Sequence, residues 1–376
     1  QPGNPAVGCD APLAPRTLAS PHAGGRAPEA AMAGAAGGTA MAVRFGLVYD
    51  FRNPERWQRP WPELFAALLD QIVFAEELGF DSIWITEHHF VEDGYTPAPL
   101  TLLTAIAMRT KRVELSTDIM LLPLYNAVRL AEEAATLDIL SNGRLMLGFG
   151  MGYRDEEFAA FGTSRRERVG RTEEGIAVLR GAWSDGPFSF EGRHYRLENV
   201  NVTPKPVQRP HPPLWLAATS EPAARRAARL DLHLLPQHDR RLAYEPWLDE
   251  LARLGKRPQD YRIGLIKPWF ITTGAEGRED PVWLQAREGE RYRAAVYAPW
   301  IRAGNFPAPA GEPEPIDQRY LVGSPNEVAE RLDRLRETLP VTDFINWGTP
   351  VGMDPADPGV RRSLERFAAE VMPQFR

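Results

Sequence analysis

The sequence predicts a TIM barrel with insertions, in which eight β-strands alternate with α-helices. Two observations support this fold: apolar runs alternate with segments of helical periodicity from residue 42 onward, and eight such runs occur over about 330 residues. Alternation of this kind produces parallel strands joined by right-handed crossovers. The alternative, an open doubly wound sheet, would carry a GxGxxG turn after its first strand, whereas "YDFRNPERW" contains no glycine.

The apolar runs predict strands near residues 44, 82, 113, 145, 215, 233, 263 and 344. In the first half each strand is followed by a helix, and Gly79 ends the first helix as a C-cap. The second half is less regular, because a proline-rich excursion with hairpin character precedes the fifth strand. A further insertion, residues 272–320, follows the seventh strand (261–270) and contains a predicted helix near 284–303. Ser324 and Glu327 then form a capping box.

Residues 1–40 differ from the rest of the chain. Ala, Gly and Pro fill 25 of these 40 positions, and Phe, Tyr, Trp and Ile are absent. Such a segment buries too little apolar surface to offset the entropy that ordering would cost. We therefore expect a disordered leader, or sequence upstream of a start at Met41, followed by one barrel domain over residues 41–376.

Composition narrows the classes of function. A net charge of −6 gives no electrostatic footprint for nucleic acid. The chain has no run of 18 apolar residues, so we expect no membrane-spanning helix. Its single cysteine, Cys9, excludes an intrachain disulfide and indicates a reducing compartment, the cytoplasm. Since Cys9 lies in the predicted leader, the barrel cannot use thiol chemistry.

Catalytic residues of TIM barrels lie at the C-terminal ends of the strands. There the sequence places Tyr49, Asp50, Glu87, His88, His89, Thr117, Asp118, Ile119, Gly150, Met151, Gly152, Tyr153, Ala218, Thr219 and Ser220. A zinc site would need three or four converging ligands. The chain has seven histidines, and the adjacent pair His88 and His89 should point to opposite sides of an extended segment. We therefore expect no catalytic metal.

The strand ends also offer places for a phosphate and for a flat ligand. Thr219 and Ser220 precede a helix whose free N–H groups suit a phosphate, although Ser220 is equally consistent with a plain N-cap. Arg168 or Arg171 could supply the countercharge, and each also fits a solvated helix face. The glycines of "GFGMG" would let a flat ligand approach the backbone, and they also fit a tight turn.

Four stretches together resemble the bacterial luciferase-like flavin monooxygenase family: "LGFDSIWITEHHF", "STDIMLLPLYNAVRLAEEAATLDILSNGRLMLGFGMGYRDEEFAAFG", "GRHYRLENVNVTPKPVQRPHPPLWLAATS" and "VGSPNEVAERL". The resemblance extends from about Val43 to Phe375. It implies a TIM barrel that binds reduced FMN, which a separate NAD(P)H:flavin reductase supplies. Reaction with O₂ would give a C4a-peroxyflavin that oxygenates a small organic substrate.

The resemblance also implies roles for particular residues. His88 would be the catalytic acid or base, His89 would orient the loop, and Glu87 would fix the tautomer of one imidazole. A cis peptide bond is expected between Asp118 and Ile119, under the flavin ring. The turns Gly150–Tyr153 and Ala218–Ser220 would contact the cofactor, with its phosphate at Thr219, Ser220 and either Arg168 or Arg171.

This chain departs from luciferase at two matching positions. Luciferase has a reactive cysteine and a phosphate-binding arginine where this chain has Gly150 and Met151, so a luminescent role is not expected. The helix of "LYNAVRLAEE" lies where the family often forms dimer contacts, which predicts a homodimer.

Three functions remain open at this point. The first is the two-component FMN monooxygenase, the second is hydride transfer with the deazaflavin F420, and the third is non-catalytic flavin binding. "EHHF" favours the FMN branch. Insertion 272–320 is expected to act as a lid over an apolar substrate pocket. Its candidate lining residues are Trp283, Tyr292, Tyr297, Trp300 and Phe306; the alternative is an external decoration without a role in the site.

Overall fold

The fold is described from a computed structural model, which covers residues 42–236, 240–272, 274, 277–303 and 319–376. The predicted leader with Cys9, the proposed start at Met41, and Phe306 of the predicted lid lie outside the described residues.

Eight parallel strands close into a barrel, as predicted. Strand β1 pairs with β2 and β13, β2 with β3, β5 with β8, β8 with β9, and β10 with β13. Two single bridges, Leu115–Leu145 and Leu234–Ile263, join the two groups of strands into one ring. The barrel strands are β1 (Arg44–Tyr49), β2 (Ser82–Ile85), β3 (Glu114–Thr117), β5 (Leu147–Gly150), β8 (Leu214–Ala218), β9 (His233–Pro236), β10 (Gly264–Ile266) and β13 (Asp343–Trp347).

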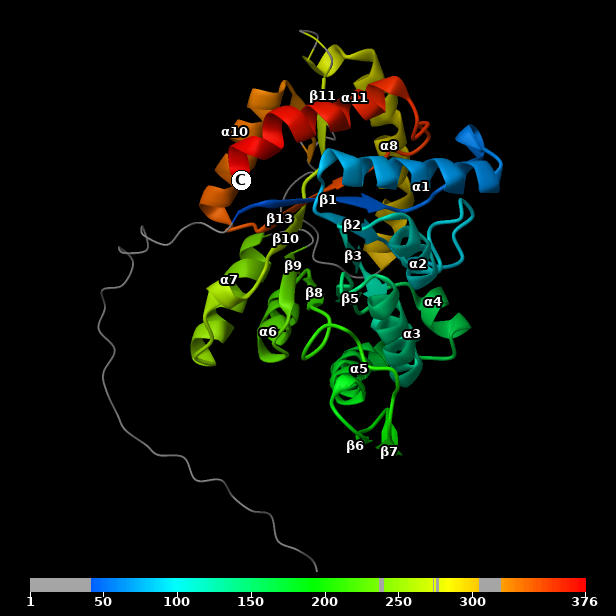
Figure 1. Ribbon diagram of the computed structural model, residues 1–376, viewed down its shortest axis with the longest axis vertical. Coiled ribbons are helices and arrows are strands. Elements are labelled where there is room, and N and C mark those ends of the chain that lie inside the picture. Colours follow the sequence, from blue (N-terminus) through cyan, green and yellow to red (C-terminus); the bar gives the residue numbers. More distant parts are fainter. Residues whose placement is uncertain (1–41, 237–239, 273, 275–276, 304–318) are drawn as a thin grey trace, which may run out of the picture. The chain divides into compact units, whose positions relative to one another are not determined.

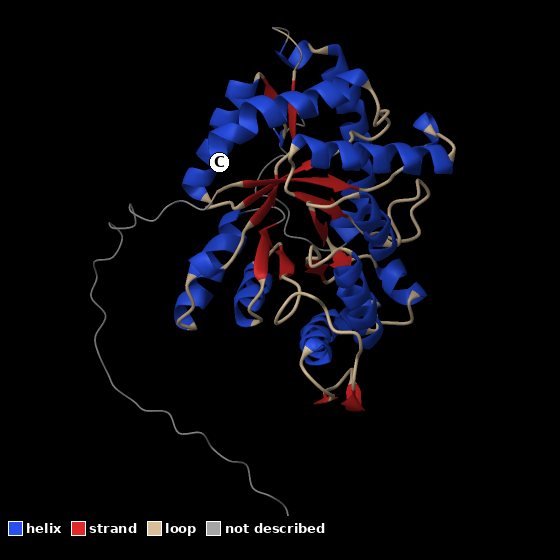
Figure 2. Cartoon of the chain, in the orientation of Figure 1, coloured by secondary structure: helices blue, strands red, loops and turns tan. Residues whose placement is uncertain are grey.

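The barrel strands are buried on both faces, which explains why the sequence shows them as continuous apolar runs. Val48, Trp84, Trp215, Leu235 and Ile345 fill the inside of the barrel together with Met146. The opposite faces pack against the surrounding helices in the main core. Figure 2 shows the strands in red at the centre with the helices in blue around them.

Each barrel strand is followed by a helix, which completes eight β–α units. Asn126 caps the third helix by accepting hydrogen bonds from two backbone amides, and Ser324 and Glu327 form the predicted capping box. Gly79 ends the first helix in the left-handed conformation, as expected. The helices are α1 (Trp61–Leu78), α2 (Pro99–Arg109), α3 (Ala127–Leu140), α5 (Arg168–Trp183), α6 (Glu221–Arg229), α7 (Arg240–Arg253), α10 (Pro325–Thr338) and α11 (Pro358–Arg366), which continues as a π-helical segment (Phe367–Val371) and a 3-10 turn (Met372–Phe375).

Two predicted strands were wrong in extent. The run 112–120 forms β3 and a separate short strand, β4 (Met120–Leu121), with the peptide bond Asp118–Ile119 between them. The run 261–270 divides at Pro268 into β10 and β11 (Trp269–Ile271). Proline has no N–H to donate to a ladder, so the strand can leave the barrel at this point. Strand β11 instead pairs with β12 (Leu321–Gly323).

The proline-rich excursion and the insertion after β11 differ in secondary structure. The proline-rich excursion contains the antiparallel hairpin of β6 (Phe188–Glu191) and β7 (Arg196–Val200). The insertion after β11 contains α8 (Pro281–Ala303), and α4 (Asp155–Ala160) is a short helix that the sequence did not reveal. In Figure 1 the arrow of β1 points toward α8, so this helix lies on the side of the barrel where the strands end. Short 3-10 helices occupy Glu55–Trp57, Leu122–Leu124, Arg165–Glu167, Pro258–Asp260 and Gly277–Glu279.

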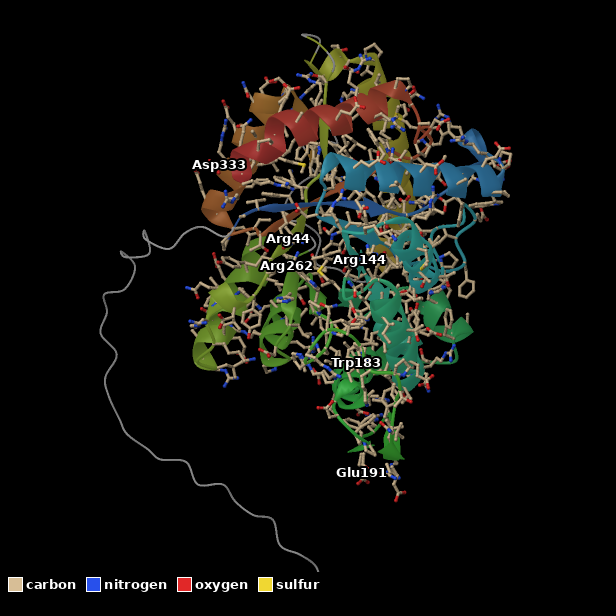
Figure 3. The ribbon with its side chains drawn as sticks, viewed as in Figure 1. Arg44, Arg144, Trp183, Glu191, Arg262 and Asp333 are labelled. Carbon is tan, nitrogen blue, oxygen red and sulfur yellow. The ribbon has the colours of Figure 1, made fainter. Side chains whose placement is uncertain are left out.

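A charged network closes the other end of the barrel, where the strands begin. Arg262 pairs with Asp343 and also donates to Glu114 at 3.0 Å, and Arg44 donates to Glu114 at 2.7 Å. Figure 3 shows Arg44 and Arg262 close together there. The Asp343 side chain is 1% exposed, so its charge depends on these arginines.

Replacing Arg262 should reduce the free energy of unfolding strongly. In Arg262→Ala the buried Asp343 carboxylate loses its main partner, and breaking a buried ion pair from one side costs about 3–5 kcal/mol. Arg334→Ala is the matched control, because Arg334 pairs with Glu330 on an exposed face of α10, where such pairs contribute little. Chemical denaturation would measure both. Equal losses in the two variants would contradict a structural role for the network.

Candidate active site

The first candidate residue, His88, follows β2 at the mouth of the barrel, which is the end where the strands finish. Its Nδ1 lies 2.9 Å from Oε1 of Glu157, and its Nε2 lies 3.1 Å from the hydroxyl of Tyr153. Burial by itself raises the pKa of the Glu157 carboxyl, but hydrogen bonds from His88 and the His89 amide, together with Arg154, outweigh it and lower the pKa. An ionised carboxylate only accepts hydrogen bonds. Nδ1 of His88 therefore carries a proton and donates it to Glu157.

Tyr153 completes the tautomer of His88. Burial raises the pKa of the Tyr153 phenol, so the hydroxyl keeps its proton. It can donate this proton to Nε2 of a neutral His88, which then has one nitrogen as donor and the other as acceptor. In that neutral form the acceptor is Nε2, on the Tyr153 side of the ring.

His89 has different surroundings, as the alternation of side chains predicted. Its Nε2 lies 2.7 Å from Oε1 of Glu87, and Glu87 also accepts hydrogen bonds from the Tyr125 hydroxyl and the Leu121 amide. Glu87 therefore orients His89 and anchors the segment that follows β3. It makes no hydrogen bond to His88, whose carboxylate partner is Glu157.

Aromatic rings enclose His88. The ring centroids of Tyr95, Trp300 and Tyr297 lie 4.9, 5.0 and 5.9 Å from that of His88. Arg154 stacks on Trp300 at 4.4 Å and donates to the carbonyl of His89. As a result His88 is only 6% exposed. Such a site keeps bulk water away from the imidazole.

Helix α8 supplies two of these rings, Tyr297 and Trp300, so the insertion covers the mouth as predicted. The role expected for Trp283 was wrong. This side chain is fully buried in a separate cluster with Phe270, Tyr320 and Val322. It lies near the start of α8, whereas the rings that contact His88 lie near the end of the helix. Tyr292 donates to Asp93 and contacts Trp57.

Two glycines beside the mouth pack closely against the end of β3 and the segment after it. The bond between Asp118 and Ile119 is cis, as predicted. A Cβ at Gly150 would lie 1.9 Å from Cδ1 of Ile119, and one at Gly148 would lie 2.1 Å from the carbonyl oxygen of Thr117. The backbone contact at Gly148 therefore leaves no room for a side chain there, whereas at Gly150 the Ile119 side chain would have to move. Met151 packs partly against the main core, and Gly152 adopts a left-handed conformation (φ +69°) that leads to Tyr153.

The two candidate arginines have different partners. Arg171 donates to the carbonyl of Pro123 at 2.9 Å and lies 3.9 Å from Glu167. Within the described residues no hydrogen bond or ion pair engages the Arg168 side chain, which is half-buried. Burial, followed by the charges of Arg165 and Arg226, lowers the pKa of Arg168. A group of three cations with one unpaired member is suited to an anion, and this favours Arg168 over Arg171.

The turn after β8 leads into α6, whose Arg226 pairs with Glu173 of α5. Ala218 is buried, while Thr219 and Ser220 are half-buried at the start of the helix. Of the two readings left open for Ser220, the plain side-chain cap is not found, since Ser220 stands at the N-cap but its hydroxyl makes no capping hydrogen bond. That hydroxyl and the first amides of the helix are consequently not engaged with each other.

Sequence reasoning missed four residues of this arrangement: Glu157, Arg154, Tyr95 and Arg165. All four lie several residues beyond the strand ends, and the rule that identified the other candidates reaches only the first residues after a strand. The acidic run "DEE" at 155–157, directly after the glycine-rich turn, was the available signal.

Glu157 should determine the tautomer of His88. In Glu157→Gln the carboxylate, which only accepts hydrogen bonds, becomes an amide that can also donate. His88 should then no longer be found only in its Nδ1-protonated form. Two-dimensional NMR of ¹⁵N-labelled histidine measures this directly. Glu87→Gln is the matched control and should alter the His89 signals instead. An unchanged His88 tautomer in Glu157→Gln would show that Glu157 does not set it.

Two absences apply to the part of the chain that the structure describes. No group of three or more His, Cys, Asp or Glu side chains there is placed to hold a metal ion. None of the described helices combines the length and apolar character that crossing a membrane requires.

Comparison with known proteins finds relatives that use two cofactors. The chain is 36% identical to an F420-dependent glucose-6-phosphate dehydrogenase from Kineococcus radiotolerans, over 82% of this chain and 93% of that protein. It is 25% identical to the oxygenase component of a flavin-dependent trigonelline monooxygenase from Acinetobacter baylyi, over 89% and 96%. With two uncharacterised Sinorhizobium fredii proteins the chain shares only about half of their length, 47% and 46%.

Solved structures agree with the fold. The monooxygenase RslO1 from Streptomyces bottropensis superimposes with a TM-score of 0.75 at 28% identity, over 89% of this chain and all of that one. A family model described as luciferase-like monooxygenase matches residues 43–342, which include the strands from β1 to β12 and every mouth residue discussed above. The chain therefore belongs to the luciferase-like monooxygenase family.

Proposed function

We propose that this protein is the oxygenase component of a two-component FMN monooxygenase that oxygenates a small organic substrate. The observation that carries the proposal is the enclosed His88, whose ring lies between Glu157 and Tyr153 at the mouth of the barrel. Two similar proteins support it: one is the oxygenase component of a flavin-dependent monooxygenase, and the other is a monooxygenase of the same fold. A separate NAD(P)H:flavin reductase would supply the reduced flavin, and the protein would work as a homodimer.

The residues present fit a flavin. Tyr153 contacts His88 and ends the turn that begins at Gly150, so a ring system bound along this turn would lie next to the imidazole. Arg168, with Thr219 and Ser220 at the start of α6, would hold the phosphate. When bound, reduced FMN would supply the electrons for activating O₂. The protein's own part is to exclude water with Tyr297 and Trp300 and to accept or return a proton at Nε2 of His88.

An F420-dependent hydride transfer is the second candidate, and the dehydrogenase relative favours it because that relative has the higher identity of the two. The same turn and arginine would serve a deazaflavin. Cofactor binding separates the candidates: we expect tighter binding of FMN than of F420 by the purified full-length protein. Selective binding of F420 would reject the oxygenase proposal.

Replacing His88 tests catalysis. With FMN, NADH and a generic flavin reductase, screening a substrate panel should find oxygen uptake coupled to product. His88→Ala should slow that reaction by about 10²- to 10⁴-fold, the usual contribution of a general acid or base. His211→Ala is the control, since His211 lies outside the mouth, against Trp183. If His88→Ala retained full activity, or if flavin bound with no coupled product in any assay, a non-catalytic flavin-binding role would replace this proposal.

Replacing Arg168 tests the phosphate site. Arg168→Gln should weaken FMN binding by roughly tenfold or more, because hydrogen bonds to charged groups contribute about 1.5–3 kcal/mol. Arg171→Gln is the matched control, since Arg171 is already engaged by the Pro123 carbonyl. Fluorescence titration of flavin measures both affinities. A larger loss in Arg171→Gln would assign the phosphate to the other arginine.

A further inference from the structure

Arg154 connects the helix over the mouth with the His88–Glu157 pair. It follows the glycine-rich turn after β5, and its side chain is 7% exposed. Nη1 donates to the His89 carbonyl at 2.7 Å and to Oε1 of Glu157 at 3.2 Å. Nε and Nη2 lie 3.0 and 2.7 Å from Oε1 of Glu156. These contacts occupy the edge of the planar guanidinium and fix its orientation, which leaves its flat faces for other contacts.

The ring of Trp300 lies against one of these faces. Its centroid is 4.4 Å from the guanidinium carbon of Arg154 and 5.0 Å from the centroid of the His88 ring. The attraction between a cation and an aromatic face is stronger where water is excluded, and the buried side chain of Arg154 meets that condition. Arg154 therefore contacts both the carboxylate partner of His88 and a ring that covers His88.

The backbone of α8 makes the position of Trp300 dependent on side-chain contacts. Pro299 directly precedes Trp300 inside the helix. Proline has no N–H, so the last turn lacks the hydrogen bond that this residue would otherwise donate to the carbonyl of Ala295. Arg293, which pairs with Asp50, and Tyr297, which bonds to the Tyr95 hydroxyl, both lie before the proline. Trp300 lies after it, where its contact with Arg154 supplies an anchor.

We propose that Arg154 is a positioning residue whose guanidinium holds Trp300 over His88, so that the cation beside Glu157 also keeps water out of the site. The inference deepens the proposed function and rests on it for the need to exclude water. In an oxygenase whose site admits water, reduced flavin and O₂ can end as oxidised flavin and hydrogen peroxide, with no oxygen atom transferred to the substrate. Arg154 would thus affect the fate of O₂ without touching it.

Two substitutions remove the stacking contact from opposite sides. An arginine can donate along its edge while its face stacks on a ring, whereas the ammonium group of lysine is a point charge without a face. Arg154→Lys should therefore keep a cation beside Glu157 and lose the stacking on Trp300. Trp300→Leu removes the ring and leaves Arg154 with all its acceptors. Together the variants separate the cover over His88 from the His88–Glu157 pair.

Fluorine NMR of the full-length protein without flavin tests the positioning. The protein is labelled with 5-fluorotryptophan, and Trp300→Phe assigns the signal of Trp300. In Arg154→Lys we expect that signal to move, and its difference between H₂O and D₂O, which reports contact with solvent, to increase. Arg361→Lys is the matched control and should leave the signal unchanged, because Arg361 of α11 stacks on Phe74 of α1 at 3.8 Å. An unchanged Trp300 signal in Arg154→Lys would overturn the proposal.

Turnover with reduced FMN tests the consequence for water exclusion. Arg154→Lys and Trp300→Leu should each raise the ratio of hydrogen peroxide to product by about 2- to 30-fold, the change in an equilibrium that corresponds to one cation–π contact. Trp300→Leu should keep the His88 tautomer of the wild type in histidine NMR, and it decides the question even if Arg154→Lys does not fold. An unchanged peroxide ratio in Trp300→Leu would overturn the role in excluding water.

The two measurements distinguish this inference from the proposed function. If the wild type formed no oxygenated product, the oxygenase proposal would fail, and the fluorine signal would still decide whether Arg154 positions Trp300. If the wild type formed product and the signal of Trp300 did not respond to Arg154→Lys, the oxygenase proposal would stand and the positioning role would fail.

Discussion

The carboxylate of Glu157 is the interaction on which the mouth of the barrel depends. One oxygen, Oε1, lies within hydrogen-bond distance of the His88 ring, the His89 amide and the Arg154 guanidinium. These partners come from the loop after β2 and from the segment after β5. A single buried charge therefore joins two loops from different β–α units, and the imidazole inherits its position and tautomer from that junction. An ionised group that is buried to this extent persists because several donors surround it.

A second set of buried charges holds α8 over the mouth. Arg293 of α8 reaches Asp50 after β1 and stacks on Trp347 at the end of β13, 3.6 Å from its ring. Tyr292 reaches Asp93, the partner of Arg52. The helix thus brings Tyr297 and Trp300 against His88 through polar contacts as well as through apolar packing. Charged contacts restrict the position of a helix more strictly than apolar packing does, because the stabilisation that each one provides falls when its distances and angles change.

The sequence was sufficient for the fold because each barrel strand is buried on both faces and each is followed by an amphipathic helix. It failed where a local feature overrode the apolar pattern. Pro268 interrupts an otherwise continuous run and sends β11 out of the barrel to pair with β12. The position of Ser220 before a helix suggested a side-chain cap, and tertiary context left the hydroxyl uncommitted.

The sequence predicted the site residues that directly follow a strand, but not the residues that they contact. Glu87, His88 and His89 follow a strand directly, so the barrel rule placed them at the mouth. Glu157 lies 69 residues from His88 in the sequence, and Arg52 lies 41 residues from Asp93. No periodicity or spacing encodes contacts of that length, since they depend on how the ring of strands closes.

The geometry of His88 bears on the direction in which a proton moves. In the neutral form of the ring, with Nδ1 donating to an ionised Glu157, Nε2 is an acceptor and the Tyr153 hydroxyl is its donor. A neutral imidazole in this tautomer first takes up a proton at Nε2, and the resulting cation would be stabilised by the carboxylate at Nδ1. The His88–Glu157 pair would then favour return of the proton from Nε2, the nitrogen on the Tyr153 side. In the proposed reaction a neutral His88 would therefore act as a base before it acts as an acid.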